Sequence, residues 1–227
     1  MSALFTDRRE AGRQLAGRLQ RFRGRADVIV LALPRGGVPV AAEIAEALDL
    51  PLDVFVVRKL GVPGQEELAM GAVASGGGRV VNEEIVRLAR VRPEVLEGVT
   101  ARELREIQRR EAAYRAGRPF PSLHGATVIV VDDGVATGST MLAGVQALRQ
   151  LGPAAVIVAA PVMAHGAKRA LERAADGCEY VALPDPFYGV GMHYGDFSQT
   201  PDEEVREILR RFPTRSFDAE AAHAGHH

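Results

Sequence analysis

Two adjacent carboxylates follow an apolar run near the middle of the 227-residue chain. The stretch VIVVDDGVATGST covers residues 128–140 and places Asp132 and Asp133 directly after four apolar residues. A carboxylate pair accepts hydrogen bonds from hydroxyl groups. The small residues and hydroxyls behind the pair suit a negative group, because backbone N–H groups at a helix start bind anions. One segment therefore combines groups for a diol with groups for a phosphate.

A sugar phosphate satisfies both halves of this segment. The carboxylates repel a phosphate, so they must face another part of the ligand. The phosphate suits the start of the helix expected near Ser139, where the helix dipole is positive. A ribose 5-phosphate carries both kinds of group. The sequence contains neither a Walker phosphate loop nor the dinucleotide fingerprint GxGxxG.

Two other segments carry groups suited to a diphosphate. LPRGGVP (33–39) ends an apolar run with Arg35, Gly36 and Gly37. Glycine lets the backbone approach a ligand closely, and the forked guanidinium of arginine matches phosphate. A second apolar run, 53–57, is followed by Arg58 and Lys59. We expect this pair to lie beyond a strand end, followed by a loop that contains glycine and proline.

The elements that would position these groups alternate along the chain. Apolar runs at 27–33, 53–57, 126–131, 154–162 and 178–183 have the length of strands, and a hairpin is expected around Gly76–Gly78. Helices are expected from Asp7 to about Phe22, at 38–50, 139–151 and 165–175, and after Pro201. This order predicts an α/β fold with a mostly parallel sheet flanked by helices. Ligands of such sheets lie beyond the carboxyl ends of the strands.

Composition narrows the class of protein. The net charge of −1 gives no basic field for nucleic acid, and no apolar run approaches the roughly 20 residues that span a bilayer. We therefore expect neither nucleic acid nor membrane as a partner. The N-terminus lacks a signal-peptide core, and the single cysteine, Cys178, excludes an intrachain disulfide. A cytoplasmic protein is expected.

One domain, residues 1–212, is expected, with residues 213–227 as a disordered tail. Residues 82–117 are charged and helix-prone, with an interruption near Pro93. This segment is expected to protrude into solvent as a lid, a dimer contact or both. Tyr114 and Arg115 can reach a diphosphate from it, although a surface role is an equal alternative.

The stretch 128–140 resembles the motif that binds phosphoribosyl diphosphate (PRPP) in type I phosphoribosyltransferases, and the element order from about residue 27 to 183 is similar to that family. The resemblance implies that Asp132 and Asp133 hold the ribose hydroxyls. It implies that Arg35, Lys59 and magnesium stabilise the leaving diphosphate. It also implies a mobile loop within residues 61–70 that closes over the site and excludes water. The residues that it places around PRPP are Arg35, Gly36, Gly37, Arg58, Lys59, Asp132, Asp133, Gly134, Val135, Ala136, Thr137, Gly138, Ser139 and Thr140.

The same resemblance implies a small hood over the acceptor, built from the N-terminal helix and residues 184–212. Phe187 is placed to stack on a heterocycle, and Asp196 to approach the diphosphate side. A plug of aromatic residues packed under the N-terminal helix is the alternative. The lysine with which hypoxanthine-guanine enzymes contact the purine oxygen is absent, since Met163 or His165 stands in that region.

The implied activity is transfer of the ribose 5-phosphate of PRPP to a nitrogen nucleophile, expected to be a nucleobase, with release of diphosphate. Mg²⁺ would arrive with PRPP, with no metal site made wholly from protein, and a homodimer is expected. The alternatives are a PRPP sensor without catalysis, a phosphotransferase or hydrolase that uses Asp132, and an amine or hydroxyl acceptor.

Overall fold

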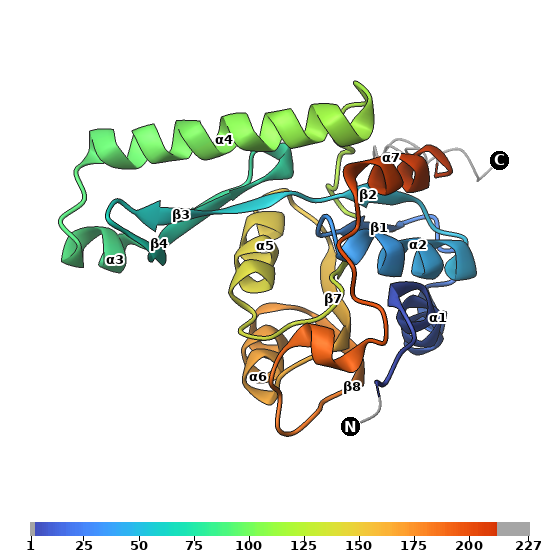
Figure 1. The fold of residues 1–227 in the computed structure, drawn as a ribbon. Coiled ribbons are helices and arrows are strands. Elements are labelled where there is room, and N and C mark those ends of the chain that lie inside the picture. Colours follow the sequence, from blue (N-terminus) through green and yellow to red (C-terminus); the bar gives the residue numbers. More distant parts are fainter. Residues whose placement is uncertain (1–2, 213–227) are drawn as a thin grey trace.

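A five-stranded parallel sheet forms the centre of the molecule, with the strand order β2-β1-β6-β7-β8 (Figure 1). The computed structural model describes residues 3–212. The strands are β1 (Val28–Ala32), β2 (Leu52–Val54), β6 (Thr127–Val131), β7 (Ala155–Val162) and β8 (Gly177–Ala182). All four neighbouring pairs run parallel. The predicted α/β fold with a mostly parallel sheet is confirmed.

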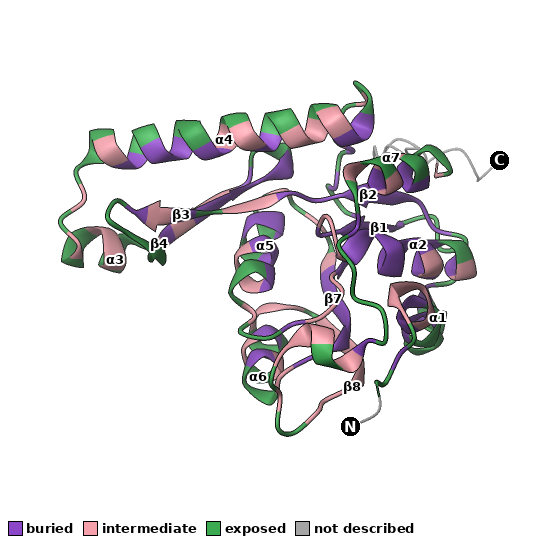
Figure 2. Ribbon diagram, in the orientation of Figure 1, coloured by how far each residue is buried: buried purple, intermediate pink, exposed green. Residues whose placement is uncertain are grey.

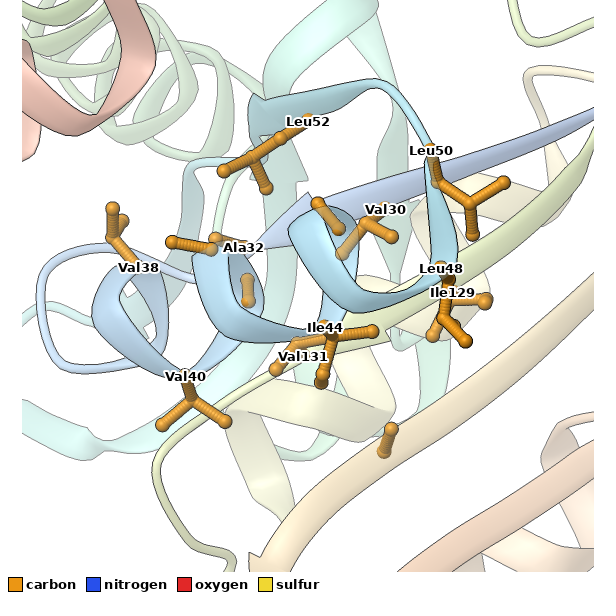
Figure 3. Packing of buried hydrophobic residues seen from close by; sticks show 14 of the residues in the cluster. Val30, Ala32, Val38, Val40, Ile44, Leu48, Leu50, Leu52, Ile129 and Val131 are labelled. Carbon is orange, nitrogen blue, oxygen red and sulfur yellow. The ribbon is translucent and has the colours of Figure 1, made fainter. Parts of the chain in front are cut away.

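Helices cover both faces of this sheet. One layer contains α1 (Arg8–Arg18), α2 (Gly37–Leu48) and α7 (Asp202–Arg210), and the other contains α5 (Ser139–Arg149) and α6 (His165–Ala174). Successive residues of a strand point to opposite faces. Ile129 of β6 accordingly packs with the α2 layer, where Figure 3 shows it close to Ile44 and Leu48, and Val128 packs with the α5 layer. Burial on both faces explains why the central strands are continuously apolar.

The register of β1 and β6 brings two of the expected site segments together. Ala32 pairs with Val131, each the last residue of its strand. The backbone N–H of Leu33 then donates to the carbonyl of Val131 at 2.8 Å. The chain that follows β1 therefore runs directly beside the chain that follows β6.

Residues 57–115 form an arm that extends away from the central sheet (Figure 1). It consists of an antiparallel sheet of β3 (Val57–Val62), β4 (Gln65–Ala74) and β5 (Arg79–Val81), followed by α3 (Glu83–Leu88) and α4 (Pro93–Arg115). The expected hairpin around Gly76–Gly78 is present as the β4–β5 connection. The expected break near Pro93 is confirmed too, because α4 begins at that residue.

The strand expected at 53–57 was wrong in its extent. It ends at Val54, and the chain enters β3 at Val57. Arg58 and Lys59 consequently lie within β3, paired with residues of β4, and not beyond a strand end. Antiparallel pairing with β4 satisfies the backbone groups there, so the strand continues through both basic residues. The loop expected within 61–70 is mainly the β3–β4 hairpin.

The helical segment 82–117 is solvated on only one side. Leu96, Val99 and Ile107 of α4 are buried in a cluster with Leu60 and Met70 of the hairpin. Figure 2 shows the buried residues of α4 along the side that faces the hairpin and exposed residues on the opposite side. Leu96, Val99 and Ile107 are separated by three and eight residues, a spacing that places them on one helix face.

The N-terminal segment packs against the chain after β8, and these two segments correspond to the predicted hood. Asp7 caps α1 as expected, accepting from the Glu10 N–H at 2.8 Å. Phe5 pairs with Tyr194, just after a short 3₁₀ turn, Val190–His193. Among residues 3–212, no helix combines the length and apolar character needed to cross a bilayer. The tail expected at 213–227 lies outside the described residues.

Candidate functional site

Asp132 and Asp133 stand at the carboxyl end of β6, against the loop that follows β1. The Asp133 N–H donates to Oδ1 of Asp132 at 2.9 Å, which fixes the first carboxylate. Gly36 lies so close that a Cβ atom on it would be 2.0 Å from Oδ2 of Asp133. Only glycine permits this approach. The structure thus brings Gly36 and Gly37 together with the acidic pair.

The two carboxylates share an environment that disfavours their charge. Burial, and then the neighbouring charge of Asp133, raise the pKa of Asp132 well above its ordinary value. Burial also raises the pKa of Asp133, although the hydrogen bond from Arg8 opposes this effect. Buried carboxylates in this state gain from any hydroxyl donor or positive charge that a ligand supplies.

The residues after the acids form an open loop at the start of α5. Val135 is buried and pairs with Met163, while Ala136, Thr137, Ser139 and Thr140 are exposed. Gly138 is the N-cap and has no side chain with which to accept from the first N–H groups of α5. The Ser139 N–H donates to the Thr137 hydroxyl at 3.4 Å, and the Thr137 and Ser139 hydroxyls lie 3.1 Å apart on exposed residues. The start of α5 is therefore open to an anion.

Arg35 lies in the loop after β1, with one third of its side chain exposed. Its Nη1 is 3.5 Å from Oδ1 of Asp202, the first residue of α7. The Tyr114 hydroxyl donates to the same oxygen at 2.9 Å. Tyr114 lies buried at the junction of α4 and α7. Burial, and then the hydrogen bond to Asp202, raise the pKa of its phenol. It orients the partner of Arg35.

Arg115, the other candidate of the helical segment, is a buried structural residue. Its Nε donates to Oδ1 of Asp53 at 2.9 Å and its Nη2 to the carbonyl of Val54 at 2.6 Å. Both Arg115 and Asp53 are nearly inaccessible to solvent. The expectation that Arg115 reaches a diphosphate or lies on the surface was wrong, because the residue joins the end of α4 to β2.

Arg58 and Lys59 lie in the arm, apart from the acidic pair. Arg58 pairs with Glu103 of α4 at 2.9 Å, and Lys59 is exposed. A pocket of about 290 Å³ contains both residues together with Gly61, Glu66, Glu67, Arg102 and Glu103. None of its lining residues belongs to the loops after β1 and β6. The pocket therefore groups Arg58 and Lys59 with residues of the arm.

The hood contacts the acidic pair through residues that were not singled out from the sequence. Arg8 donates from Nε to Oδ2 of Asp133 at 2.8 Å, and the Tyr194 hydroxyl donates to the Asp133 carbonyl at 2.6 Å. Phe187 is half-buried, with its ring centroid 5.3 Å from that of His193. This packing agrees with the aromatic plug. Asp196 is exposed and accepts from the Ser198 N–H at 2.8 Å.

The alternatives to the missing purine-contacting lysine differ in their exposure. Met163 is completely buried, with its sulfur 3.6 Å from the Cys178 sulfur, whereas His165 is exposed at the first position of α6. Burial raises the pKa of the Cys178 thiol to about 11. Within residues 3–212, no group of three His, Cys, Asp or Glu side chains is arranged to hold a metal ion.

The sequence profile of the phosphoribosyl transferase domain matches residues 8–192, from the first turn of α1 into the hood. The chain belongs to this family. Two Mycobacterium tuberculosis proteins named "Putative phosphoribosyl transferase" are each 46% identical to it over 208 residues. These matches cover 92% of this chain and 47% of each relative, so the chain spans about half the length of these curated relatives.

A solved structure with high sequence identity to this chain shows the same architecture. The crystal structure of TT1426 from Thermus thermophilus superposes with a TM-score of 0.83 and 40% identity. The match covers 92% of this chain and 99% of the other. Coverage of that extent includes most of the arm, so the arm is shared by both proteins.

Proposed function

We propose that the chain binds PRPP at the carboxyl ends of β1 and β6 and transfers its ribose 5-phosphate to a nitrogen nucleophile. The observation that carries this proposal is the contact between Gly36 and Asp133, which joins an arginine-glycine loop to a half-buried acidic pair. Family membership supports the reaction class. The proposal concerns a chain that is about half as long as its curated relatives.

Each part of PRPP has a group suited to it. Asp132 and Asp133 would accept hydrogen bonds from the ribose hydroxyls, since hydroxyl donors relieve their unfavourable burial. The Gly134–Thr140 loop and the first turn of α5 would hold the 5-phosphate. Arg35 and the backbone of Gly36 and Gly37 would hold the diphosphate. Mg²⁺ bound to that diphosphate would neutralise charge on the leaving group.

The side chains would then favour departure of diphosphate from the anomeric carbon. Positive charge develops on the ribose ring as the bond breaks, and the negative potential of Asp132 and Asp133 would stabilise it. Arg35 would stabilise the negative charge that develops on the diphosphate. Arg58 and Lys59 remain candidates for the same task, but from the arm. A nucleobase is the proposed acceptor, bound under the hood near Phe187, with Asp196 towards the diphosphate side.

The assembly and the location of the protein are part of the same proposal. We place the enzyme in the cytoplasm as a homodimer, with residues 1–212 as one domain that carries the arm as an insertion. The arm extends from the central sheet (Figure 1), and Leu68 and Leu88 on it are exposed. This is the region that we assign to a subunit contact or a lid.

Diphosphate release from Mg·PRPP tests the function directly. Purines, pyrimidines and simple amines are offered in turn, and Asp132→Asn and Asp133→Asn are compared with wild type. Losing a hydrogen bond to a charged group costs about 1.5–3 kcal/mol, so each variant is expected to lower the rate about 10- to 100-fold. Asp49→Asn is the matched control, because Asp49 is an exposed carboxylate in a left-handed conformation that asparagine tolerates.

Three results separate the possibilities. Release with one acceptor, reduced in both site variants and not in the control, supports the transferase and identifies the acceptor. A higher melting temperature with Mg·PRPP but no release with any acceptor supports a sensor. A protein that neither binds nor consumes PRPP contradicts the proposal.

A further inference from the structure

Arg8, the first residue of α1, joins the hood to the acidic pair. Its Nε donates to Oδ2 of Asp133 at 2.8 Å, and its Nη1 donates to the Ser198 carbonyl at 2.7 Å. The guanidinium carbon lies 4.0 Å from the centre of the Phe197 ring. Only 11% of the Arg8 side chain is exposed. One contact to Asp133 and two to the adjacent residues Phe197 and Ser198 thus hold a single guanidinium in place.

The surrounding hood is connected to the same residue by backbone hydrogen bonds. The N–H of Phe5 donates to the His193 carbonyl at 3.0 Å, and the N–H of Gly195 donates to the Phe5 carbonyl at 2.8 Å. The Asp196 N–H donates to the Thr6 carbonyl at 2.7 Å. The N-terminal segment and residues 193–198 therefore form one unit, and Arg8 is its link to the Asp133 carboxylate.

The geometry at Asp133 leaves one carboxylate oxygen for a ligand. Oδ2 receives Arg8 and lies against Gly36. Within the described residues, no hydrogen bond reaches Oδ1 of Asp133. A carboxylate held at one oxygen by a buried arginine presents the other in a fixed direction.

We propose that Arg8 is a positioning residue that orients Asp133 for a ribose hydroxyl and couples the ordering of the hood to the binding of PRPP. This inference rests on the proposed function. A ligand hydroxyl that donates to Oδ1 favours the ionised form of Asp133. The ionised form pairs more strongly with Arg8. The hood that Arg8 links to Asp133 becomes more ordered as a result. The acceptor side of the site is thereby completed when PRPP arrives.

The charges around Asp133 make Arg8 the group that sustains its ionised form. The titratable groups that face it are Arg8 of α1, Asp132 of the same loop and the Tyr194 phenol of the hood, which donates to its backbone carbonyl. Burial, followed by the charge of Asp133, raises the pKa of Tyr194, so this phenol stays neutral. Without Arg8, the main opposition to the effect of burial is lost, so Asp133 would take up a proton at a higher pH than in wild type.

The test compares Arg8→Gln, Arg8→Lys and wild type in two measurements. The first is the affinity for Mg·PRPP between pH 6 and pH 8. The second is hydrogen exchange at the amides of Phe5, Gly195 and Asp196, with and without Mg·PRPP. Arg9→Gln is the matched control, because Arg9 is an adjacent arginine that pairs with Glu43 and Glu204 on the surface.

We expect wild type and Arg9→Gln to gain protection in the hood when Mg·PRPP binds. Arg8→Gln should bind about 10- to 100-fold more weakly, with the loss greatest at pH 6, and should gain no hood protection. Arg8→Lys keeps a positive charge but not the fork that also reaches Ser198. It should retain affinity at pH 6 better than Arg8→Gln and still lose the hood protection.

Failure of the inference is distinct from failure of the function. If wild type binds Mg·PRPP and Arg8→Gln binds equally well with the same pH profile and the same hood protection, the inference is wrong. If Arg8→Lys behaves as Arg8→Gln in both measurements, a purely structural role replaces it. If wild type does not respond to Mg·PRPP at all, the proposed function is contradicted and this inference with it.

Discussion

The central sheet buries apolar residues on both faces, whereas the arm buries one side of a hairpin under one side of α4 (Figure 2). The two regions also treat buried carboxylates differently. Asp132, at the edge of the sheet, has its pKa raised by burial and by Asp133. For Glu103 in the arm, burial alone would raise the pKa, but hydrogen bonds from Arg102 and Arg58 outweigh burial and lower it.

This contrast distinguishes carboxylates that are available to a ligand from carboxylates that serve only the fold. An acid whose charge is poorly compensated is available to a ligand, while an acid held by two arginines is already satisfied. The sheet is well enough packed to hold the uncompensated pair in place. The arm has a thin core and compensates its buried charge internally. We therefore expect substitutions in the two regions to differ in sign as well as in size.

The largest effect is expected at the junction of the two regions. Arg115→Met removes the partner of Asp53 and leaves that carboxylate buried without its counter-charge. Breaking a buried pair in this way costs about 3–5 kcal/mol. The melting temperature should fall by roughly 6–20 °C for a chain of this size. Thermal unfolding followed by circular dichroism measures the change.

A second variant distinguishes lost pairing from lost packing at this junction. Arg115→Met combined with Asp53→Leu removes both charges, so most of the stability should return. If the double variant is less stable than Arg115→Met alone, packing of Arg115, including its contact with Phe120, accounts for the effect. The junction would then be held mainly by apolar contacts.

Two matched isoleucine-to-alanine substitutions compare how much the packing of each core contributes to stability. Ile129 of β6 and Ile107 of α4 are both buried, but only Ile129 lies between two helix layers. Replacing either with alanine should cost between about 2 and 5 kcal/mol, with Ile129→Ala near the upper limit and Ile107→Ala near the lower. The thin cover of the arm lets it relax around the cavity. Urea denaturation gives both values, and equal costs would contradict the ranking.

The smallest effects should have opposite signs. Because the pKa of Asp132 is raised in the folded state, its ionised form destabilises the fold at neutral pH, and this cost disappears as pH falls through the raised pKa. Asp132→Asn should therefore raise the melting temperature slightly at pH 7, because asparagine carries no charge in the folded state. The gain should diminish as pH is lowered.

Glu103→Gln is the counterpart in the arm. Its lowered pKa means that ionised Glu103 stabilises the fold above the ordinary pKa of glutamate, and that this stability is lost as pH falls through the lowered value. The variant should lower the melting temperature slightly at pH 7, because Arg58 and Arg102 are exposed enough for water to screen the pair. Two variants with the same sign at pH 7 would contradict the contrast between the regions.

The sequence predicted the parts of the molecule that local patterns encode. The parallel strands follow from continuous apolar runs, and the positions of Asp132, Asp133 and Gly36 follow from the rule that parallel strands end at one edge. The extent of β3 could not be predicted, because Arg58 and Lys59 continue a strand only when β4 pairs with them. Arg8, Tyr194 and Asp202 carry no local signal. Their partners are distant in the chain, 125 residues away in the case of Arg8 and Asp133.

The contact between Arg8 and the Ser198 carbonyl, 190 residues apart, sets an order of events during synthesis. Chains are made at about 5–20 residues per second, so Arg8 leaves the ribosome roughly 10–40 s before its last partner. The residues of α1 leave the ribosome early in this interval, but the unit that they form with residues 193–198 cannot yet exist. A chain released between residues 140 and 193 would carry the whole of segment 128–140 and still lack residues 193–198 of the hood. The contact of Arg8 with residues 193–198 can therefore form only after the chain has been synthesised through residue 198.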